Sequence, residues 1–381
     1  MSVRTLLLDA VHENHFLYEM EKRDRPNNAI RLLVSLHELQ ATSEQLTSAY
    51  QEALRDLQPI RGSESGRVNQ DNWQDFLGVT EFYKDYLLFY DDELSRLGLE
   101  KTLETYFYPI QTSIGSQLQP IVHLAFGIEN GLSEVITQAL AYYSSSFIDA
   151  SSIVDLPTSE NNNNVFSTMN TAADTLIFDM IGSDQRFDGK IEGNNTFHSA
   201  VKLLLKSKFD LLKTYMIEWS KLSMTPTQRL DALLLTAAKL IKYASREDGT
   251  HHTDLDWFLA GGQLIESALA IKKLIRPEHL EHWCNLQFLS TLCTFIVQGR
   301  PITTAATATS AHTIMAPLTW EKCIALILES SDPKAILAIV SLLKAYRVNP
   351  SLEPLYLENA TILAQFVQDG TWVKAGLGWS N

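Results

Sequence analysis

The sequence has few cysteines and no long run of apolar residues. Its 381 residues contain only three cysteines, which form no Cys-x-x-Cys pair and, being odd in number, cannot all pair within the chain. So few cysteines, in an odd number, are typical of proteins in a reducing compartment. No segment offers the roughly 18 to 20 uninterrupted apolar residues that a membrane-spanning helix needs, and the apolar run at residues 6–8 is too short for a secretion signal. We therefore expect a cytoplasmic protein with no membrane partner.

Basic residues are also scarce relative to acidic ones. The chain has 31 lysines and arginines against 45 aspartates and glutamates, a formal net charge of −14. Proteins that bind the phosphate backbone of nucleic acids present a basic surface. We therefore expect no nucleic-acid partner, whereas the hydrophobic content of 45% allows a sizeable core.

Common cofactor and metal motifs are missing as well. No Gly-x-Gly-x-x-Gly follows a predicted strand and no P-loop motif is present, so the sequence encodes no recognisable nucleotide site. Histidines three residues apart occur at His12 and His15 and again at His279 and His282. Such pairs can ligate a metal from one helix face, but we interpret them as solvated or polar helix turns and predict no metal site.

Helical periodicity dominates the chain. Leucines recur at spacings of three and four in one segment after another, and no segment alternates with a period of two between turn signals. Thr42 followed by Ser43 and Glu44 is a typical helix start. These patterns predict helices over residues 32–39, 46–57, 200–219, 230–243, 254–275, 277–297 and 334–346.

The helices are expected to form one domain. No motif recurs in register, which excludes a regular solenoid. An asparagine-rich stretch at residues 155–165 is a possible internal boundary, although we favour a long surface loop within one domain. We therefore predict an all-α fold, with residues 1–381 forming a single large multi-helix domain.

Aromatic residues and histidines supply the candidates for a site. Trp257 and Phe258 precede Gly261-Gly262 in a helical pattern, where glycines indicate either close helix packing or the approach of a ligand. His123 lies in an apolar helix and must find a partner if it is buried. The tyrosines at 83 and 86 have helical spacing, which is typical of a core stripe as well as of a pocket wall.

The stretch from residue 72 to 98 carries the most information about function. It contains Trp-x-x-x-Leu-Gly at 73–78, Tyr-x-x-Tyr-Leu-x-Phe at 83–89 and Glu-x-x-x-x-Gly at 93–98. This series resembles the N-terminal part of the questin oxidase-like family, and further pieces follow in family order at 120–129, 138–143, 256–259, 299–301 and 372–379. The family is known from fungal enzymes that open an anthraquinone ring by a Baeyer–Villiger type oxidation.

The resemblance implies an oxidoreductase that acts on an aromatic or polyketide-like ketone with dioxygen and NADPH. A small apolar or aromatic ligand is then the expected partner, and NADPH is expected from the resemblance alone. The candidate residues divide into two groups. The catalytic candidates are His123, His252 and His37; the substrate-binding candidates are Trp73, Tyr83, Tyr86, Trp257 and Phe258.

The chain also departs from the family pattern. Family members usually carry histidines at four positions that are occupied here by Asn28, Gln119, Gly261 and Ser267. Imidazole is the usual acid–base group near neutral pH, so the loss of several removes proton-transfer capacity. Three readings follow: a divergent enzyme, a non-catalytic helical protein that keeps a small apolar ligand pocket, or a helical interaction protein.

Overall fold

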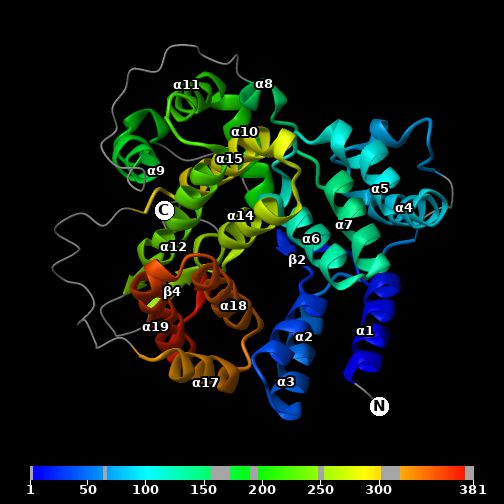
Figure 1. Ribbon diagram of the computed structural model, residues 1–381, viewed down its shortest axis with the longest axis horizontal. Coiled ribbons are helices and arrows are strands. Elements are labelled where there is room, and N and C mark those ends of the chain that lie inside the picture. The colour runs from blue at the N-terminus through cyan, green and yellow to red at the C-terminus, as the bar shows by residue number, and fades with distance from the viewer. Residues whose placement is uncertain are drawn as a thin grey trace.

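Helices form nearly all of the regular structure in this computed structural model, as Figure 1 shows. The structure describes residues 3–62, 67–155, 172–188, 196–247, 253–301 and 318–373. The all-α prediction is confirmed. Most of the asparagine-rich stretch lies outside the described residues, so the internal boundary suggested there stays a prediction.

The α-helices run in chain order from the N-terminus to residue 369. They are α1 (Val3–Leu17), α2 (Ala29–Glu38), α3 (Ser43–Arg55), α4 (Tyr83–Leu97), α5 (Leu99–Thr102), α6 (Gln119–Asn130), α7 (Ser133–Ser145), α8 (Ser151–Val154), α9 (Ala172–Asp174), α10 (Phe197–Ser207), α11 (Phe209–Ser220), α12 (Pro226–Tyr243), α13 (Trp257–Ala260), α14 (Gln263–Leu274), α15 (Leu280–Val297), α17 (Trp320–Ser330), α18 (Pro333–Val348) and α19 (Glu353–Asp369). π-Helical turns extend α5 and α9, at Leu103–Phe107 and Thr175–Ile181.

Short strands form two small sheets. β1 (Glu21–Lys22) and β2 (Arg25–Pro26) make an antiparallel hairpin. Its turn residues, Arg23 and Asp24, both have positive φ, 49° and 64°, as a type I′ turn requires. In the second sheet, β4 (Thr253–Asp256) pairs antiparallel with β3 (Ser245–Glu247) and parallel with β5 (Trp372–Val373).

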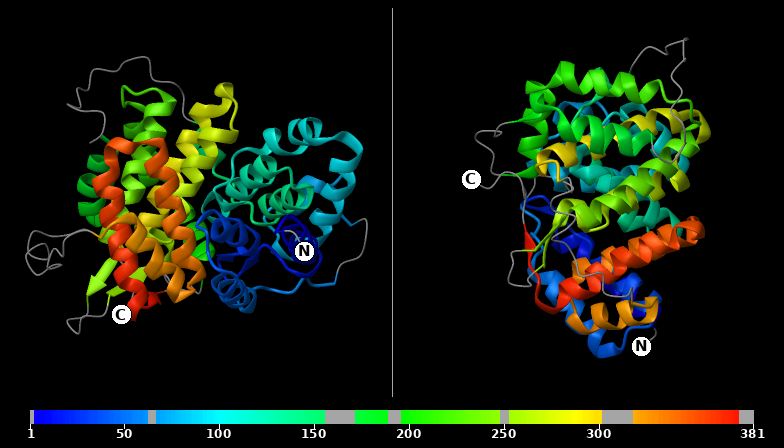
Figure 2. Two further views of the ribbon diagram at one scale, coloured as in Figure 1. Left: turned by 60° about the horizontal axis from the view of Figure 1, so that its bottom comes forward. Right: turned by 90° about the vertical axis from the view of Figure 1, so that its left-hand side faces the viewer.

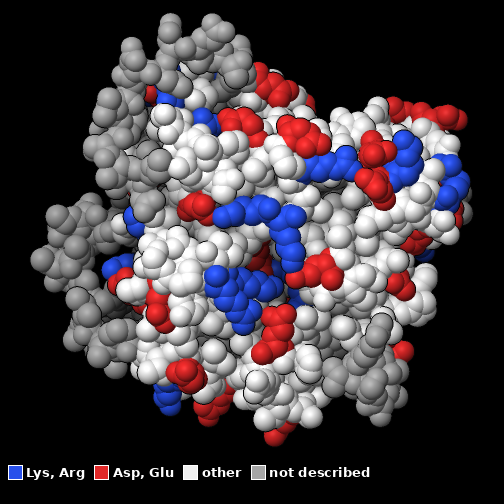
Figure 3. Space-filling view, in the orientation of Figure 1, with Lys and Arg blue, Asp and Glu red and all other residues white. Residues whose placement is uncertain are grey.

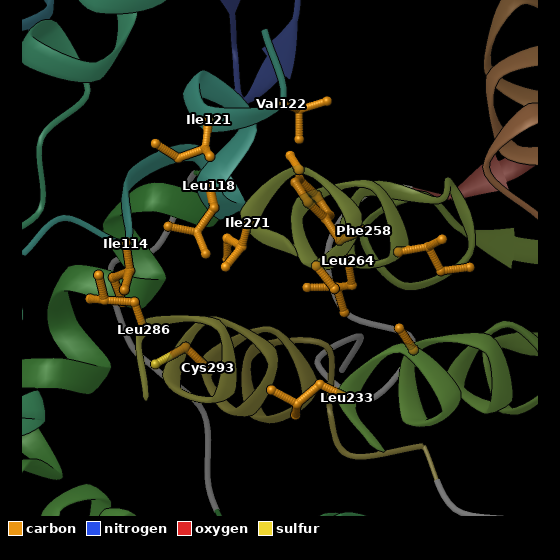
Figure 4. Packing of buried hydrophobic residues seen from close by; sticks show 14 of the residues in the cluster. Ile114, Leu118, Ile121, Val122, Leu233, Phe258, Leu264, Ile271, Leu286 and Cys293 are labelled. Carbon is orange, nitrogen blue, oxygen red and sulfur yellow. The ribbon is translucent and has the colours of Figure 1, made fainter. Parts of the chain in front are cut away.

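The helices gather in two groups that share one core. α4, α6 and α7 pack together beside α1 and α2, while α12, α14, α15, α18 and α19 form the second group (Figures 1 and 2). α6 joins the groups because it packs on both α7 and α14. Figure 4 shows this junction, where Leu118 lies beside Ile271 of α14 and Ile114 lies beside Leu286 of α15. A single apolar cluster extends from α2 to α19, in agreement with one domain.

Two predicted helices are interrupted in the structure. The segment 200–219 divides into α10 and α11 because Lys208 has non-helical backbone angles, φ −120° and ψ 25°. The segment 254–275 begins as β4, continues as the short α13 and restarts as α14 after Gly262, whose φ is +86°. Asp256 caps α13, since its Oδ1 accepts from the backbone N–H groups of Phe258 and Leu259 at 2.9 and 3.1 Å.

The glycine pair at this break allows close packing. A Cβ on Gly261 would lie 2.4 Å from the Trp257 ring, and a Cβ on Gly262 would lie 2.6 Å from Ser341 Oγ on α18. Only a hydrogen fits in either place. The close-packing interpretation of these glycines is therefore correct.

Charges on the face shown in Figure 3 are interspersed. Basic side chains gather near its middle, over α14 and α18, with acidic side chains beside them. Two α14 lysines illustrate the pairing, since Lys272 contacts Asp231 at 2.6 Å and Lys273 contacts Glu129. Within the described part of the chain, no helix combines the length and the apolar character that crossing a membrane requires.

Candidate functional site

A pocket of about 330 Å³ opens where β2, α2 and α3 meet α13 and the start of α18. Its size falls at the lower end of the range for small-molecule sites. The residues that line it come from these elements and from the end of α17. They are Arg25, Pro26, Asn28, Ala29, Leu32, Glu52, Ala53, Asp56, Leu57, Trp257, Ser330, Asp332, Pro333, Lys334 and Leu337.

The charged residues of the pocket are largely paired with one another. Arg25 contacts Asp56 at 2.7 Å, and Lys334 lies 4.0 Å from the same carboxylate. Asp332 caps α18 through Oδ1 and accepts from Trp372 Nε1 through Oδ2 at 2.8 Å. Burial, and then the charge of Arg25, lower the pKa of Lys334. The pocket therefore offers a ligand both an apolar wall and a set of charged groups that are largely paired with one another.

Trp257 is the aromatic part of that wall. Its side chain is only 6% exposed, and its Nε1–H is buried without an acceptor among the described residues. The amide of Gln263, which begins α14, is buried in the same unpaired state. Lys334 Nζ lies 5.7 Å from the centre of the Trp257 ring. Buried polar atoms are nearly always hydrogen-bonded, so these unpaired atoms are exceptions; Trp257 lines the pocket, whereas Gln263 does not.

A buried ion pair lies directly behind the pocket wall. Arg31 and Glu266 contact each other with side chains only 4% and 7% exposed. The Arg31 guanidinium also donates to Asn28 Oδ1 at 3.0 Å and to Gln119 Oε1 at 3.4 Å. Asn28 lines the pocket as well, so the ion pair is connected to the wall through one hydrogen bond.

Two of the four positions at which the resemblance leads us to expect histidines lie together. Asn28 Oδ1 and Gln119 Oε1 both accept from the guanidinium of Arg31. Ser267 instead donates to the carbonyl of Leu264 at 3.3 Å, and Gly261 packs against the Trp257 ring. The structure therefore brings only Asn28 and Gln119 of these four to one charged group.

His123 is buried in α6, close enough to Arg31 to feel its charge. It is 3% exposed, its Nε2 has no partner within the described part of the chain, and its ring lies 6.1 Å from that of Tyr142. Burial, and to a smaller extent the charge of Arg31, lower the pKa of His123 well below its usual range. The side chain is therefore a neutral imidazole at physiological pH.

A second charged centre joins the β1–β2 hairpin to α10. His198 Nδ1 lies 2.7 Å from Asp24 Oδ1 and 3.0 Å from Glu21 Oε1. Burial opposes a charged imidazole, but the two carboxylates raise the pKa of His198 to about 10. Burial likewise opposes the charged carboxylates, and His198 nevertheless holds the pKa values of Glu21 and Asp24 below their usual range.

A left-handed turn supports this second centre. Ser116, Gln117 and Leu118 precede α6 with φ of 50°, 52° and 60°, a conformation that costs roughly 1–2 kcal/mol per residue. The turn is held by side chains, because Ser116 Oγ donates to Glu21 Oε2 at 2.5 Å and Gln117 Nε2 donates to Thr294 Oγ1 at 3.1 Å. Strained backbone of this kind is found preferentially at functional sites.

The predicted site residues are distributed over several places. Trp257 lines the pocket. His123 is buried in α6, His37 is exposed at the end of α2, and His252 lies outside the described residues. Phe258 stacks on Phe197 with ring centres 4.1 Å apart.

The remaining aromatic candidates pack in the core around α4. Tyr86 donates to the carbonyl of Trp73 at 2.5 Å, and the Trp73 ring meets the edge of Tyr106. Burial raises the pKa of Tyr83 well above its usual range. Trp73, Tyr83 and Tyr86 do not line the pocket beside Trp257, and a role for them in binding stays a prediction.

Sequence reasoning did not find the charged residues. Arg31 and Glu266 are separated by most of the chain, and His198 is 174 residues from Asp24. No local spacing relates such residues, so only the tertiary structure brings them together. The one local signal was the position of Glu21 close to a polar turn that itself contains Asp24.

The protein is thus an all-α protein with a small pocket, behind which lies a buried ion pair. A family model described as questin oxidase-like matches residues 26–342. The chain therefore belongs to the questin oxidase-like family, and the resemblance noted in the sequence is confirmed. A search of curated proteins finds no match.

Proposed function

We propose that the protein is an oxidoreductase that binds a small, flat aromatic ketone in the pocket beside Trp257. The ring of Trp257 in the wall of this pocket carries this proposal. The aromatic part of the ketone would lie against that ring, and its oxygen would accept from the Trp257 Nε1–H, which is covered in this structure, once the ring turns toward the pocket. Membership of the questin oxidase-like family supports the oxidoreductase class.

The proposed reaction is a Baeyer–Villiger type insertion of oxygen. One oxygen atom of dioxygen enters the bond between the carbonyl carbon and its neighbour, which gives an ester or lactone. The other leaves as water, with NADPH and a proton supplying the two electrons and two hydrogens. His123, neutral and buried, does not line the pocket, and it is the proposed proton-transfer group because of the family resemblance.

NADPH itself does not fit the pocket described above. A volume of about 330 Å³ is suited to one small molecule, whereas NADPH contains two nucleotides. No residue of this pocket is therefore assigned to NADPH, and NADPH consumption is measured separately from ketone binding.

Binding and turnover are tested in the same preparation. Hydroxyanthraquinones are titrated against the intrinsic fluorescence, and the bound compound is then incubated with NADPH and isotopically labelled dioxygen. Mass spectrometry should show a product that has gained one labelled oxygen. Failure of the whole hydroxyanthraquinone series to bind would contradict the proposed ligand class.

Substitutions separate the roles of the residues. Trp257→Phe keeps a ring but removes the N–H, and should weaken binding by about 2- to 10-fold, since a neutral hydrogen bond contributes about 0.5–1.5 kcal/mol. Trp320→Phe is the matched control, because Trp320 stacks on Tyr346 away from the pocket.

His123→Ala should abolish turnover with binding retained; unaltered turnover would remove His123 from the mechanism.

A binding protein without turnover is the second candidate. The contacts of Arg31 favour it, since Asn28 and Gln119, at two positions where the resemblance leads us to expect histidine, accept from its guanidinium and offer no imidazole for proton transfer. Ligand binding that depends on Trp257, with no oxygen transfer under any condition, would support this candidate over the enzyme.

A further inference from the structure

We propose that Glu21, Asp24 and His198 form a binding site for a divalent transition-metal ion. Each residue offers one ligand atom, and the three atoms lie within 4.8 Å of one another. This site is separate from the proposed oxidation: it involves none of the residues that line the pocket. It also goes beyond the family match, which begins at residue 26, after both carboxylates.

The spacing of the three atoms suits a metal ion with little movement. His198 Nδ1 is 2.7 Å from Asp24 Oδ1 and 3.0 Å from Glu21 Oε1. Metal–ligand bonds of about 2.0–2.2 Å place neighbouring ligands of a tetrahedral ion roughly 3.3–3.6 Å apart. An outward shift of each ligand by a few tenths of an ångström therefore makes room for the ion.

The second oxygen of each carboxylate is fixed by donors from other elements. Glu21 Oε2 accepts from Ser116 Oγ at 2.5 Å and from Tyr142 Oη at 2.7 Å. Asp24 Oδ2 accepts from the backbone N–H of Phe197, the first residue of α10, at 2.7 Å. Metal-binding carboxylates are typically held in this way, with one oxygen on the metal and the other in a hydrogen bond that orients the ligand.

The site is buried but not closed. The side chains of Glu21, Asp24 and His198 are 17%, 11% and 19% exposed, so solvent reaches the cluster. Three protein ligands with an open side leave a coordination position for water, the arrangement of catalytic more than structural zinc sites.

The ligand set selects the kind of ion. One imidazole nitrogen and two carboxylate oxygens suit Zn²⁺, Mn²⁺, Fe²⁺ or Co²⁺, whereas Mg²⁺ and Ca²⁺ prefer oxygen alone. Without a metal, Nδ1 carries a proton between the two carboxylates. The ion takes the place of this proton, which is released to solvent.

The test uses the full chain, freed of metal by chelation and then titrated with Zn²⁺ and with Co²⁺. Calorimetry gives affinity and stoichiometry, and the visible absorption of bound Co²⁺ reports nitrogen and oxygen coordination. We expect about one ion per chain. Absence of stoichiometric binding by either ion would overturn the proposal.

Isosteric variants locate the ion. Asp24→Asn keeps the turn, since asparagine tolerates its positive φ, and should lower the affinity at least about 10- to 100-fold. Glu21→Gln should do the same and serves if Asp24→Asn fails to fold. Asp91→Asn is the matched control, because it removes the carboxylate from another pair, with His15 Nε2 at 2.9 Å. Wild-type affinity in both site variants would refute the assignment, whatever the outcome of the oxidation assay.

Discussion

Replacing Arg31 by methionine should destabilise the protein far more than an ordinary charge substitution. Methionine is of similar length but leaves Glu266 as an unpaired carboxylate that is 7% exposed. It also removes the donor to Asn28 and Gln119. Breaking a buried pair by removing one partner costs about 3–5 kcal/mol, because the remaining charge has lost both water and its counter-ion.

This cost converts to a measurable shift of the melting temperature. Unfolding entropy is about 2.1 cal/mol/K per residue, which for 381 residues amounts to about 0.8 kcal/mol/K. A loss of 3–5 kcal/mol therefore lowers Tm by about 4–6 °C. Circular dichroism at 222 nm during heating, a helix signal, or scanning calorimetry measures this shift.

The double variant Arg31→Met with Glu266→Met provides the decisive comparison. It removes both charges, so most of the lost stability should return. Arg55→Met is the matched control: Arg55 pairs with Glu52 at the surface with side chains 74% and 52% exposed, and its loss should cost less than about 1 kcal/mol. A shift below about 1 °C for Arg31→Met, or a double variant no more stable than the single one, would refute the reasoning.

Three further predictions concern pH, backbone and thiols. The two carboxylates raise the pKa of His198 to about 10 despite its burial, whereas unfolded histidine titrates near pH 6.5, so the pairing contributes stability that is full below about pH 6.5 and is lost as pH rises to about 10. The Tm of His198→Gln should therefore fall less than the Tm of the wild type between pH 7 and 10. Equal falls in Tm would contradict this. Gly262→Ala should lower Tm more than Gly98→Ala in the same melting assay. Both glycines have positive φ, but of the two only Gly262 would bring a Cβ against packed atoms. Equal decreases in Tm would show that this contact relaxes freely. The three buried cysteines, whose pKa values burial raises, should react with a thiol reagent only on unfolding, and rapid labelling of the native protein would contradict their burial.

The helical fold could be predicted because its signals are local. Thr42 begins α3 as expected, with a reciprocal hydrogen bond to Gln45 that satisfies both residues. Leucine spacing identifies a buried face within each helix without knowledge of its neighbours. The breaks at Lys208 and Gly262 were not predicted, because they depend on how the helices on either side pack.

The site could be predicted only in part. Trp257 was a candidate as an aromatic wall of an apolar binding slot, and the structure places it in the pocket wall. The charged groups around it have no sequence signature, since Arg31 and Glu266 meet only when α2 packs near α14. The same holds for Glu21 and His198. Burial turns such ordinary charged residues into a site, and burial of a polar residue is set by the tertiary fold.

The ion pairs and hydrogen bonds that join the β1–β2 hairpin to α10 also have a consequence for synthesis of the chain. Asp24 and the backbone of His198 are 174 residues apart. At about 5–20 residues per second, the ribosome needs roughly 9–35 s to make the intervening segment. The contacts of Asp24 with Phe197 and His198 can therefore form only after this interval, whereas Glu21 can already bond to Ser116 and Tyr142.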